Sequence, residues 1–373
     1  MSMAACCWER VGADNKLSVD SPFDKQLLEG FAKAVNGSKI VVCSYKNVKR
    51  RTLLGGRGIV VQYIEGHFDS ERLGPNRSAE VVLRVDPEDF NFTKADSAEK
   101  VAIIDLLLPG NRAGVPTSVF ACPTPVANGH VILVPRCEQL LPQVLTEDTM
   151  LMGLRLLEQS RRRDFRLFFN SPGTNAPVNH FHFHGLYLDY LNAPGSQLGI
   201  EKAERYRVSG DTTPGNLSVE LLSEANWWAR GFVLSAGCRK GLRGSEPAAD
   251  CQALAALVAR LTKEMQKRNV PHSVYVAPAL EAKPPKVVAG EDGEEQEVPC
   301  ALSPEVYLLP RRAAEVGARG PSAFEMAGLV RLTEEEVIDV VTEEGLHGYF
   351  IANCTPQGDV LDELICKAAW LSN

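Results

Sequence analysis

The sequence predicts an α+β protein in which an antiparallel sheet is flanked by helices. Strand-like apolar segments follow one another between residues 117 and 188, and an amphipathic helix interrupts them at 145–163. The short links between these segments favour antiparallel neighbours with the helix packed on one face. The chain has 373 residues, 45% of them hydrophobic, and can form two modules or one large composite domain with a full core.

The first part of the chain is expected to supply most of the elements. The periodicity of its apolar residues separates helices from strands. In chain order, the expected elements are a loose polar tail (1–20), an amphipathic helix (24–36), two strands (58–64 and 80–85), two strands joined by a turn (117–135), a helix (145–163), a strand (165–170) and a tight loop (171–178). Thr146 suits the N-cap of the helix at 145–163, because its hydroxyl can accept from a first-turn amide.

The remainder of the chain is expected to form a second half-module. Its elements are a strand (229–236), a helix (251–267) and two further strands (273–278 and 305–312). The acidic stretch 283–299 is poor in apolar residues and is expected to be a mobile loop. "VYLLPRR" (306–312) echoes "VILVPRC" (131–137), which suggests two related half-modules. We place them at 21–240 and 241–373.

Composition excludes several classes of protein. A formal net charge of −7 argues against non-specific binding of nucleic acid. No apolar run approaches the ~20 residues needed to cross a bilayer, and the start of the sequence does not resemble a secretory signal. The ten cysteines are therefore expected to be free thiols in the cytoplasm.

The candidate functional residues lie in "NHFHFHGLYL" (179–188), which holds three of the seven histidines. Strict alternation with phenylalanine predicts a strand, so His180, His182 and His184 should share one face over ~13 Å. Phe181 and Phe183 then face the core. A helix would scatter the three histidines around its circumference.

Three interpretations of these histidines are open. They can be solvated polar residues, metal ligands, or a nucleophile with its supports. No further ligand stands nearby at recognisable spacing, so neither a metal nor another cofactor is expected. A neutral imidazole, with an unperturbed pKa of ~6.5, can attack phosphorus, and neighbouring histidines can donate to the phosphoryl oxygens. The loop at 171–178 offers backbone N–H groups for a phosphate.

Four stretches carry a resemblance to a known family, and they cover much of the chain. They are "FNFTK" (90–94), "GHVILVPRCEQLLPQVL" (129–145), "FRLFFNSPGTNAPVNHFHFHGLYL" (165–188) and "FEMAGLV" (324–330). Together they resemble the GDP-hexose phosphorylases, relatives of galactose-1-phosphate uridylyltransferase in the histidine-triad superfamily. The resemblance implies a histidine-triad-like sheet and transfer of GMP from a GDP-hexose to inorganic phosphate through a guanylylated histidine. A homodimer is left open.

The resemblance also implies roles for individual residues. In these roles His182 is the nucleophile, His180 holds its ring, His184 donates to the phosphate, Asn170 lies near the ribose, Gly173 lets the loop approach the nucleotide, and Lys94 contacts a phosphate. Members acting on GDP-L-galactose carry Gln at the third triad position and those acting on GDP-D-glucose carry His, so His184 favours GDP-D-glucose. GDP-L-galactose as the substrate, or water as the acceptor, remains an alternative.

The chain also departs from the family pattern. It has "NSPG" where the family usually has "NSLG", and residues 55–77 follow the family only loosely, so no base-recognising residue is assigned there. His130 and His272 lie beside predicted strands and are expected to be structural.

Overall fold

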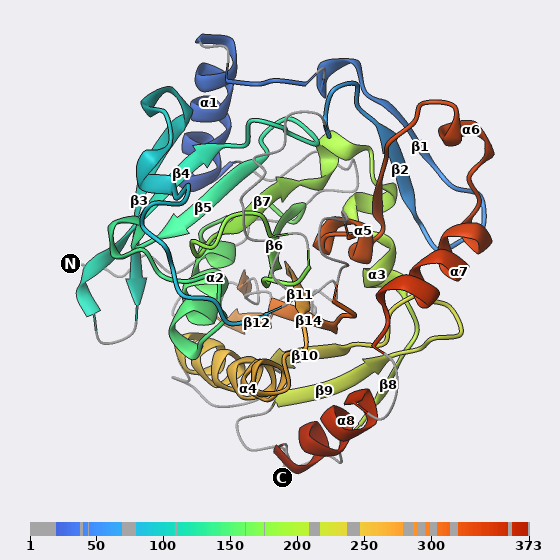
Figure 1. The fold of residues 1–373 in the computed structure, drawn as a ribbon. Helices are drawn as coiled ribbons and strands as arrows, with labels where there is room; N and C mark the ends of the chain where they lie inside the picture. Colours follow the sequence, from blue (N-terminus) through green and yellow to red (C-terminus); the bar gives the residue numbers. More distant parts are fainter. Residues whose placement is uncertain are drawn as a thin grey trace.

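The core of the molecule is one ten-stranded antiparallel sheet (Figure 1). The computed structural model describes residues 20–37, 40–43, 45–68, 80–108, 111–160, 162–174, 176–208, 217–236, 247–278, 286–289, 295–298, 304–313, 320–356 and 360–371. In spatial order the strands are β3 (Lys100–Leu108), β4 (Asn111–Ala121), β5 (Val131–Pro135), β7 (Phe183–Tyr187), β6 (Phe165–Asn170), β11 (His272–Pro278), β14 (Pro304–Pro310), β10 (Phe232–Ala236), β9 (Leu217–Leu222) and β8 (Arg205–Arg207). The predicted α+β class with an antiparallel sheet is confirmed.

The sheet consists of two five-stranded sets with the same topology. The first set runs β3-β4-β5-β7-β6 and the second runs β8-β9-β10-β14-β11, so that β6 and β11 meet at the centre. Each set has one long helix in the same place along the chain, α2 (Glu147–Gln159) in the first and α4 (Pro247–Lys267) in the second. The two sequence segments that echo each other lie in β5 and β14, which are not equivalent, because β14 corresponds to β7. The boundary expected at residue 240 falls after β10, inside the second set.

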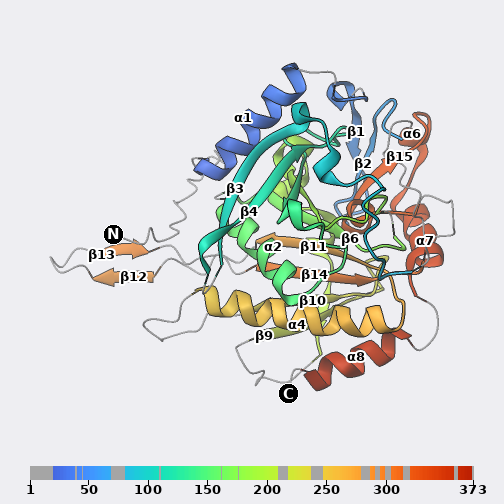
Figure 2. The ribbon, with the colours of Figure 1, turned by 60° about the vertical axis from the view of Figure 1, so that its left-hand side comes forward.

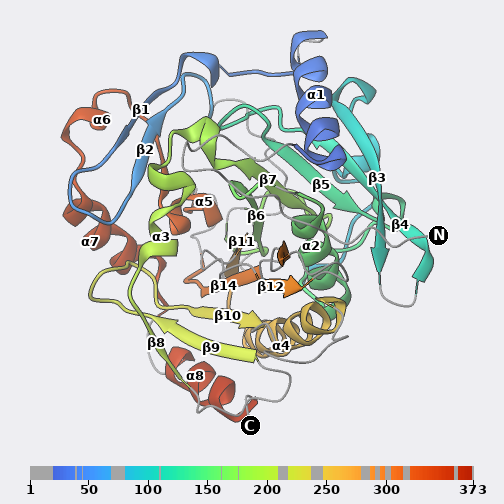
Figure 3. The same ribbon diagram turned by 180° about the vertical axis from the view of Figure 1, so that it is seen from behind.

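Four helices cover one face of the sheet (Figure 3). They are α1 (Pro22–Gly37), α2, α4 and α8 (Val360–Leu371). The main hydrophobic core lies beneath them and includes the fully buried Leu167, Phe169, Phe181 and Phe183. Thr146 caps α2 as predicted, because its side chain accepts a hydrogen bond from the Thr149 amide.

A smaller layer covers the opposite face. Its three-stranded sheet contains β1 (Lys49–Thr52), β2 (Val60–Tyr63) and β15 (Leu329–Leu332), and β15 pairs in parallel with β2. The short helices of this layer are α3 (Gly199–Lys202), α5 (Ala323–Ala327), α6 (Val337–Val340) and α7 (Glu343–Cys354). Single 3-10 turns lie at η1 (Tyr45–Asn47), η2 (Phe92–Lys94), η3 (Ser97–Glu99), η4 (Cys137–Gln139), η5 (Leu188–Leu191) and η6 (Pro194–Ser196). A second core fills the space between this layer and the main sheet.

Two predicted segments differ from the structure. Residues 80–85 do not form a strand, because side chains bind their main-chain groups: the Val81 amide donates to Asn269 Oδ1 (2.8 Å), and Asn179 Nδ2 donates to the Arg84 carbonyl (2.8 Å). Within 283–299, β12 (Lys286–Ala289) and β13 (Glu295–Val298) pair as a hairpin that projects from the body (Figure 2). Main-chain pairing does not need apolar side chains, so an acidic stretch can adopt it. The rest of this stretch and the tail 1–19 lie outside the described residues.

Among the described residues, no helix combines the length and the apolar character that crossing a membrane requires.

Candidate active site

The three clustered histidines lie where β7 begins. The expected single strand over all three is partly wrong, because β7 starts at Phe183, whereas His180 lies in a bend and His182 lies outside any strand. Their main chain is held instead by a neighbouring loop: the Phe181 amide donates to the Leu141 carbonyl (2.7 Å) and the His182 amide to Gln143 Oε1 (2.8 Å). The predicted alternation is confirmed for Phe181 and Phe183, which are fully buried in the main core.

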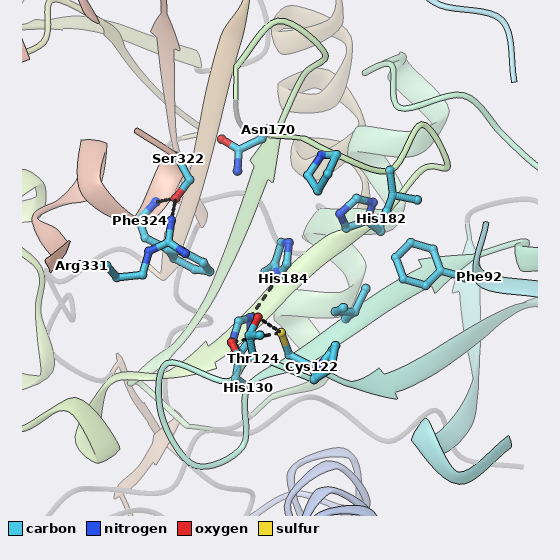
Figure 4. Close-up of a pocket in the computed structure, with 14 residues that line it drawn as sticks. Phe92, Cys122, Thr124, His130, Asn170, His182, His184, Ser322, Phe324 and Arg331 are labelled. Atoms are coloured by element: carbon cyan, nitrogen blue, oxygen red, sulfur yellow. Dashed lines mark hydrogen bonds between the residues drawn. The ribbon is translucent and has the colours of Figure 1, made fainter. Parts of the chain in front are cut away.

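His182 has a ring whose protonation is fixed by its surroundings. Nδ1 lies 2.7 Å from the His180 carbonyl, which can only accept, so Nδ1 carries the proton and Nε2 keeps its lone pair. The ring lines a cavity on the face opposite the long helices, next to Phe92 (Figure 4). Burial lowers the pKa of His182 to about 4, and the His180 carbonyl only partly opposes this shift. At neutral pH the imidazole is therefore uncharged and nucleophilic.

His184 is the last member of a hydrogen-bond chain. The Val126 amide donates to His130 Nδ1 (3.2 Å), so Nε2 of His130 carries the proton and donates to His184 Nδ1 (2.9 Å; Figure 4). The remaining N–H of His184 is then at Nε2, where it is available as a donor in the cavity. Burial first, and the neighbouring imidazole second, lower the pKa of His184 well below its ordinary value. His130, which we expected to be structural, thus sets the tautomer of His184.

His180 does not line the cavity. It is fully buried, and its Nδ1 accepts from the Phe92 amide (3.0 Å), while its carbonyl holds the His182 ring. Burial and the neighbouring His182 lower the pKa of His180 to about 4. His180 therefore holds the His182 ring through its main-chain carbonyl.

Arg331 on β15 brings a cationic group to the cavity wall. Its guanidinium is bound to Glu325 (2.5 Å), Ser322 Oγ (3.0 Å) and His67 Nε2 (3.0 Å), and it lies against the Phe324 ring. These bonds hold the side chain in one orientation. Sequence reasoning missed Arg331, because only the parallel pairing of β15 with β2 brings it to the histidines. The adjoining stretch 324–330 was the one available signal.

The structure separates the three residues expected to bind substrate. Asn170 lines the cavity, and its Oδ1 accepts from Ser273 Oγ (2.9 Å) and from the Ala323 amide (2.8 Å), which turns its Nδ2 donor away from both. Gly173 has φ +80° in the loop after β6 but is not part of the cavity lining. Lys94 Nζ donates to two main-chain carbonyls, of Glu88 and Asp89, and is not part of the lining either.

One set of side chains has the composition of a metal site. The possible ligand atoms of Cys122, His130 and His184 lie within 4.8 Å of one another. A metal would need the lone pair of His130 Nε2, which would move the proton to Nδ1, against the N–H group of Val126. The set therefore fits a hydrogen-bonded histidine pair better than a resident metal. Metal-independent turnover stays a prediction.

Comparison with known proteins shows which family the first part of the chain resembles. Residues 22–186 match the family described as GDPGP1-like, N-terminal domain. The resemblance to the GDP-hexose phosphorylases that the sequence indicated is thereby confirmed.

Similar proteins carry names from the same group. GDP-D-glucose phosphorylase 1 of Danio rerio is 33% identical over 170 residues, which is 46% of this chain and 48% of that protein. GDP-L-galactose phosphorylase 2 of Arabidopsis thaliana is 25% identical over 319 residues, or 79% and 64% of the two chains. GDP-D-glucose phosphorylase 1 of Homo sapiens is 28% identical over 277 residues, which is 72% of this chain and 66% of that protein. The matches therefore span from about half to about two thirds of these relatives.

A solved structure with the same fold is yeast Ap4A phosphorylase Apa2 in complex with Ap4A. The TM-score is 0.54 at 12% sequence identity, and the match covers 91% of this chain and 100% of that chain. At this identity the likeness describes the arrangement of the sheet and helices.

Proposed function

We propose that the protein is a GDP-hexose phosphorylase that transfers GMP from GDP-D-glucose to inorganic phosphate. The observation that carries this proposal is the pair of imidazoles in the cavity: His182 has an unprotonated Nε2, and His184 beside it has an N–H donor. A nucleophile and a donor for phosphoryl oxygens are the two groups that a two-step nucleotidyl transfer needs. The names of the relatives supply the substrate class.

In the first step, His182 Nε2 attacks the α-phosphorus of the GDP-hexose. A nitrogen–phosphorus bond forms, the bond to the bridging oxygen breaks, and its electron pair leaves with the hexose 1-phosphate. The ring becomes positively charged, and the Nδ1–H bond to the His180 carbonyl stabilises that charge. In the second step, an oxygen of inorganic phosphate attacks the same phosphorus, releases neutral His182 and forms GDP.

The groups around His182 have supporting roles in this proposal. His184 donates from Nε2 to the non-bridging oxygens, where charge accumulates. Asn170 Nδ2 donates to the ribose. For Gly173 and Lys94 the proposed contacts with nucleotide and phosphate rest on the family resemblance alone.

Relatives named for GDP-L-galactose and for GDP-D-glucose both match the chain. His at the third triad position supports GDP-D-glucose. A phosphorolysis panel with GDP-D-glucose, GDP-L-galactose, GDP-D-mannose and diadenosine tetraphosphate decides this point. Product formation without added phosphate would identify water as the acceptor and the enzyme as a nucleotide-sugar hydrolase.

The surroundings in which the enzyme works are part of the proposal. All six cysteines that the structure describes are free thiols, which supports a reducing, cytoplasmic location. The net charge of −7 supports small-molecule partners rather than nucleic acid.

The covalent step provides the test. Incubation with GDP-D-glucose but no phosphate should release hexose 1-phosphate and leave GMP on His182, as an adduct stable to base and labile to acid. Peptide mapping by mass spectrometry locates the adduct. Finding it on His180 or His184, or finding steady-state kinetics that are not ping-pong, would refute the proposed mechanism.

A further inference from the structure

The main-chain segment that carries His182 lies where two strands of the sheet separate. The ladder between β6 and β7 ends with the pair Phe168 and His184. Beyond this pair β6 continues to Asn170 and is bonded on its other side to β11, where Asn170 pairs with Ser273. On the β6 side, His182 therefore lacks the neighbouring strand that would hold its peptide groups.

The side chain of Gln143 occupies the gap. Its Oε1 accepts from the His182 amide (2.8 Å), and its Nε2 donates to the His182 carbonyl (3.2 Å) and to the Asn170 carbonyl (3.0 Å). The side chain is fully buried. One carboxamide thus replaces a peptide group of the missing ladder and links the main chains of β6 and of the histidine segment.

Gln143 is itself held in place by its neighbours. Its amide donates to Asn179 Oδ1 (3.1 Å), and two residues earlier the Leu141 carbonyl accepts from the Phe181 amide (2.7 Å). Pro142 lies between them, and its ring restricts the backbone. The loop therefore binds the histidine segment at two successive residues.

We propose that Gln143 is a positioning residue for His182: its buried amide sets where the attacking nitrogen lies relative to the α-phosphorus. Gln143 does not line the cavity, so it acts through the main chain of His182. Nucleophilic attack needs near-attack geometry, and a displacement of about 1 Å can cost ~10² in rate. The catalytic meaning of this inference rests on the proposed function, whereas the effect on the ring does not.

The test compares two variants with a matched control. Gln143→Met keeps the length of the side chain and removes all three hydrogen bonds. Gln143→Glu keeps an acceptor for the His182 amide but replaces the donor to the His182 and Asn170 carbonyls with a second acceptor. Gln266→Met is the control, because its Nε2 donates to a nearby main-chain carbonyl, that of Leu145 (3.0 Å), and not to the histidine segment.

Three quantities are measured for each protein. They are the single-turnover rate of hexose 1-phosphate release, the Kd for GDP, and the ¹⁵N NMR signals of the His182 ring. For Gln143→Met we expect the release rate to fall ~10²-fold while the Kd for GDP changes less than about threefold. The ring signals should broaden or shift. Gln266→Met should resemble the wild type in all three, and Gln143→Glu should show the same selective loss.

Other outcomes would overturn the inference. Unchanged release rates and ring signals in both Gln143 variants would show that the amide does not position the ring. If GDP binding and the rate of hexose 1-phosphate release weaken by the same factor, Gln143 has a structural role only. If Gln143→Met does not fold, Gln143→Glu decides by the same criteria. If the wild type forms no adduct, the proposed function fails, and the ring signals still show whether Gln143 positions His182.

Discussion

The two halves of the main sheet carry polar side chains on the same face and use them differently. In the second half, Arg205 binds Glu305 through two nitrogens (3.1 and 3.0 Å), and Tyr307 donates to the same carboxylate (2.8 Å). In the first half, His182 and His184 are neutral rings in which one lone pair and one N–H remain directed to the cavity.

The difference lies in whether the polar groups satisfy one another. Opposite charges that bond to each other form a closed set, which stabilises the fold but leaves nothing for a substrate. The bond from His130 leaves His184 with a free donor, and the bond to the His180 carbonyl leaves His182 with a free acceptor. The two halves have the same backbone topology. They differ in whether their polar side chains are bonded to one another or keep a donor and an acceptor for a ligand.

The largest expected effect separates the two halves by activity. His182→Asn should lower GDP-hexose turnover by at least ~10³, because loss of the nucleophile removes the two-step route. Tyr307→Phe, which removes only the hydroxyl bonded to Glu305, should stay within about threefold of the wild type. Steady-state assays with equal amounts of folded protein measure both. Substantial phosphorolysis by His182→Asn would contradict the comparison.

A second prediction concerns stability at the junction of the halves. Arg166 on β6 and Glu201 are both fully buried and lie 2.7 Å apart. Arg166→Met should lower the free energy of unfolding by about 3–5 kcal/mol, because Glu201 is left as an uncompensated buried charge. Urea denaturation gives this value. Arg166→Met combined with Glu201→Gln should recover part of the loss, and if it does not, the ion pair is not the cause.

A third prediction uses acid to distinguish the regions. The pKa of His182 is about 4 in the folded chain and ~6.5 when unfolded, so between these values only the unfolded chain binds the proton. The contribution of His182 to the free energy of unfolding is therefore fully present above pH ~6.5. It decreases by about 1.4 kcal/mol per pH unit as the pH falls toward 4. The free energy of unfolding, measured by urea denaturation at several pH values between 7 and 5, should depend on pH less steeply by this amount in His182→Asn than in the wild type. Tyr307→Phe should keep the wild-type slope.

The smallest expected effect lies within the first half. His184→Gln should reduce turnover less than about tenfold, because the glutamine amide can still donate to a phosphoryl oxygen. His184→Ala should be clearly worse. Equal losses in the two variants would show that the imidazole ring of His184, and not its donor, is needed.

Sequence patterns predicted local structure better than long-range partnership. The strands and the helix from 117 to 170 and the buried phenylalanines followed from periodicity, and Thr146 from its capping chemistry. Residues 80–85 have the composition of a strand, but their hydrogen-bond partners are side chains far along the sequence. No local pattern contains that information.

The candidate site shows the same division. The histidines were found from their alternation in one short segment, and Asn170 was assigned from the family resemblance of the segment before it. His130 was noticed but was expected to be structural, since its bond to His184 depends on the pairing of β5 with β7. Arg331 and Gln143 were missed, because each reaches the histidine segment from a separate part of the chain.

The parallel pairing of β15 with β2 has a consequence for synthesis on the ribosome. Ser322, Phe324 and Arg331 form one wall of the cavity, and they are translated long after the histidines. A nascent chain that has completed only the first five-stranded set therefore carries His182 without this wall of the cavity. Contacts of such large sequence separation form late and slowly, so the cavity is complete only after the chain has been made through β15.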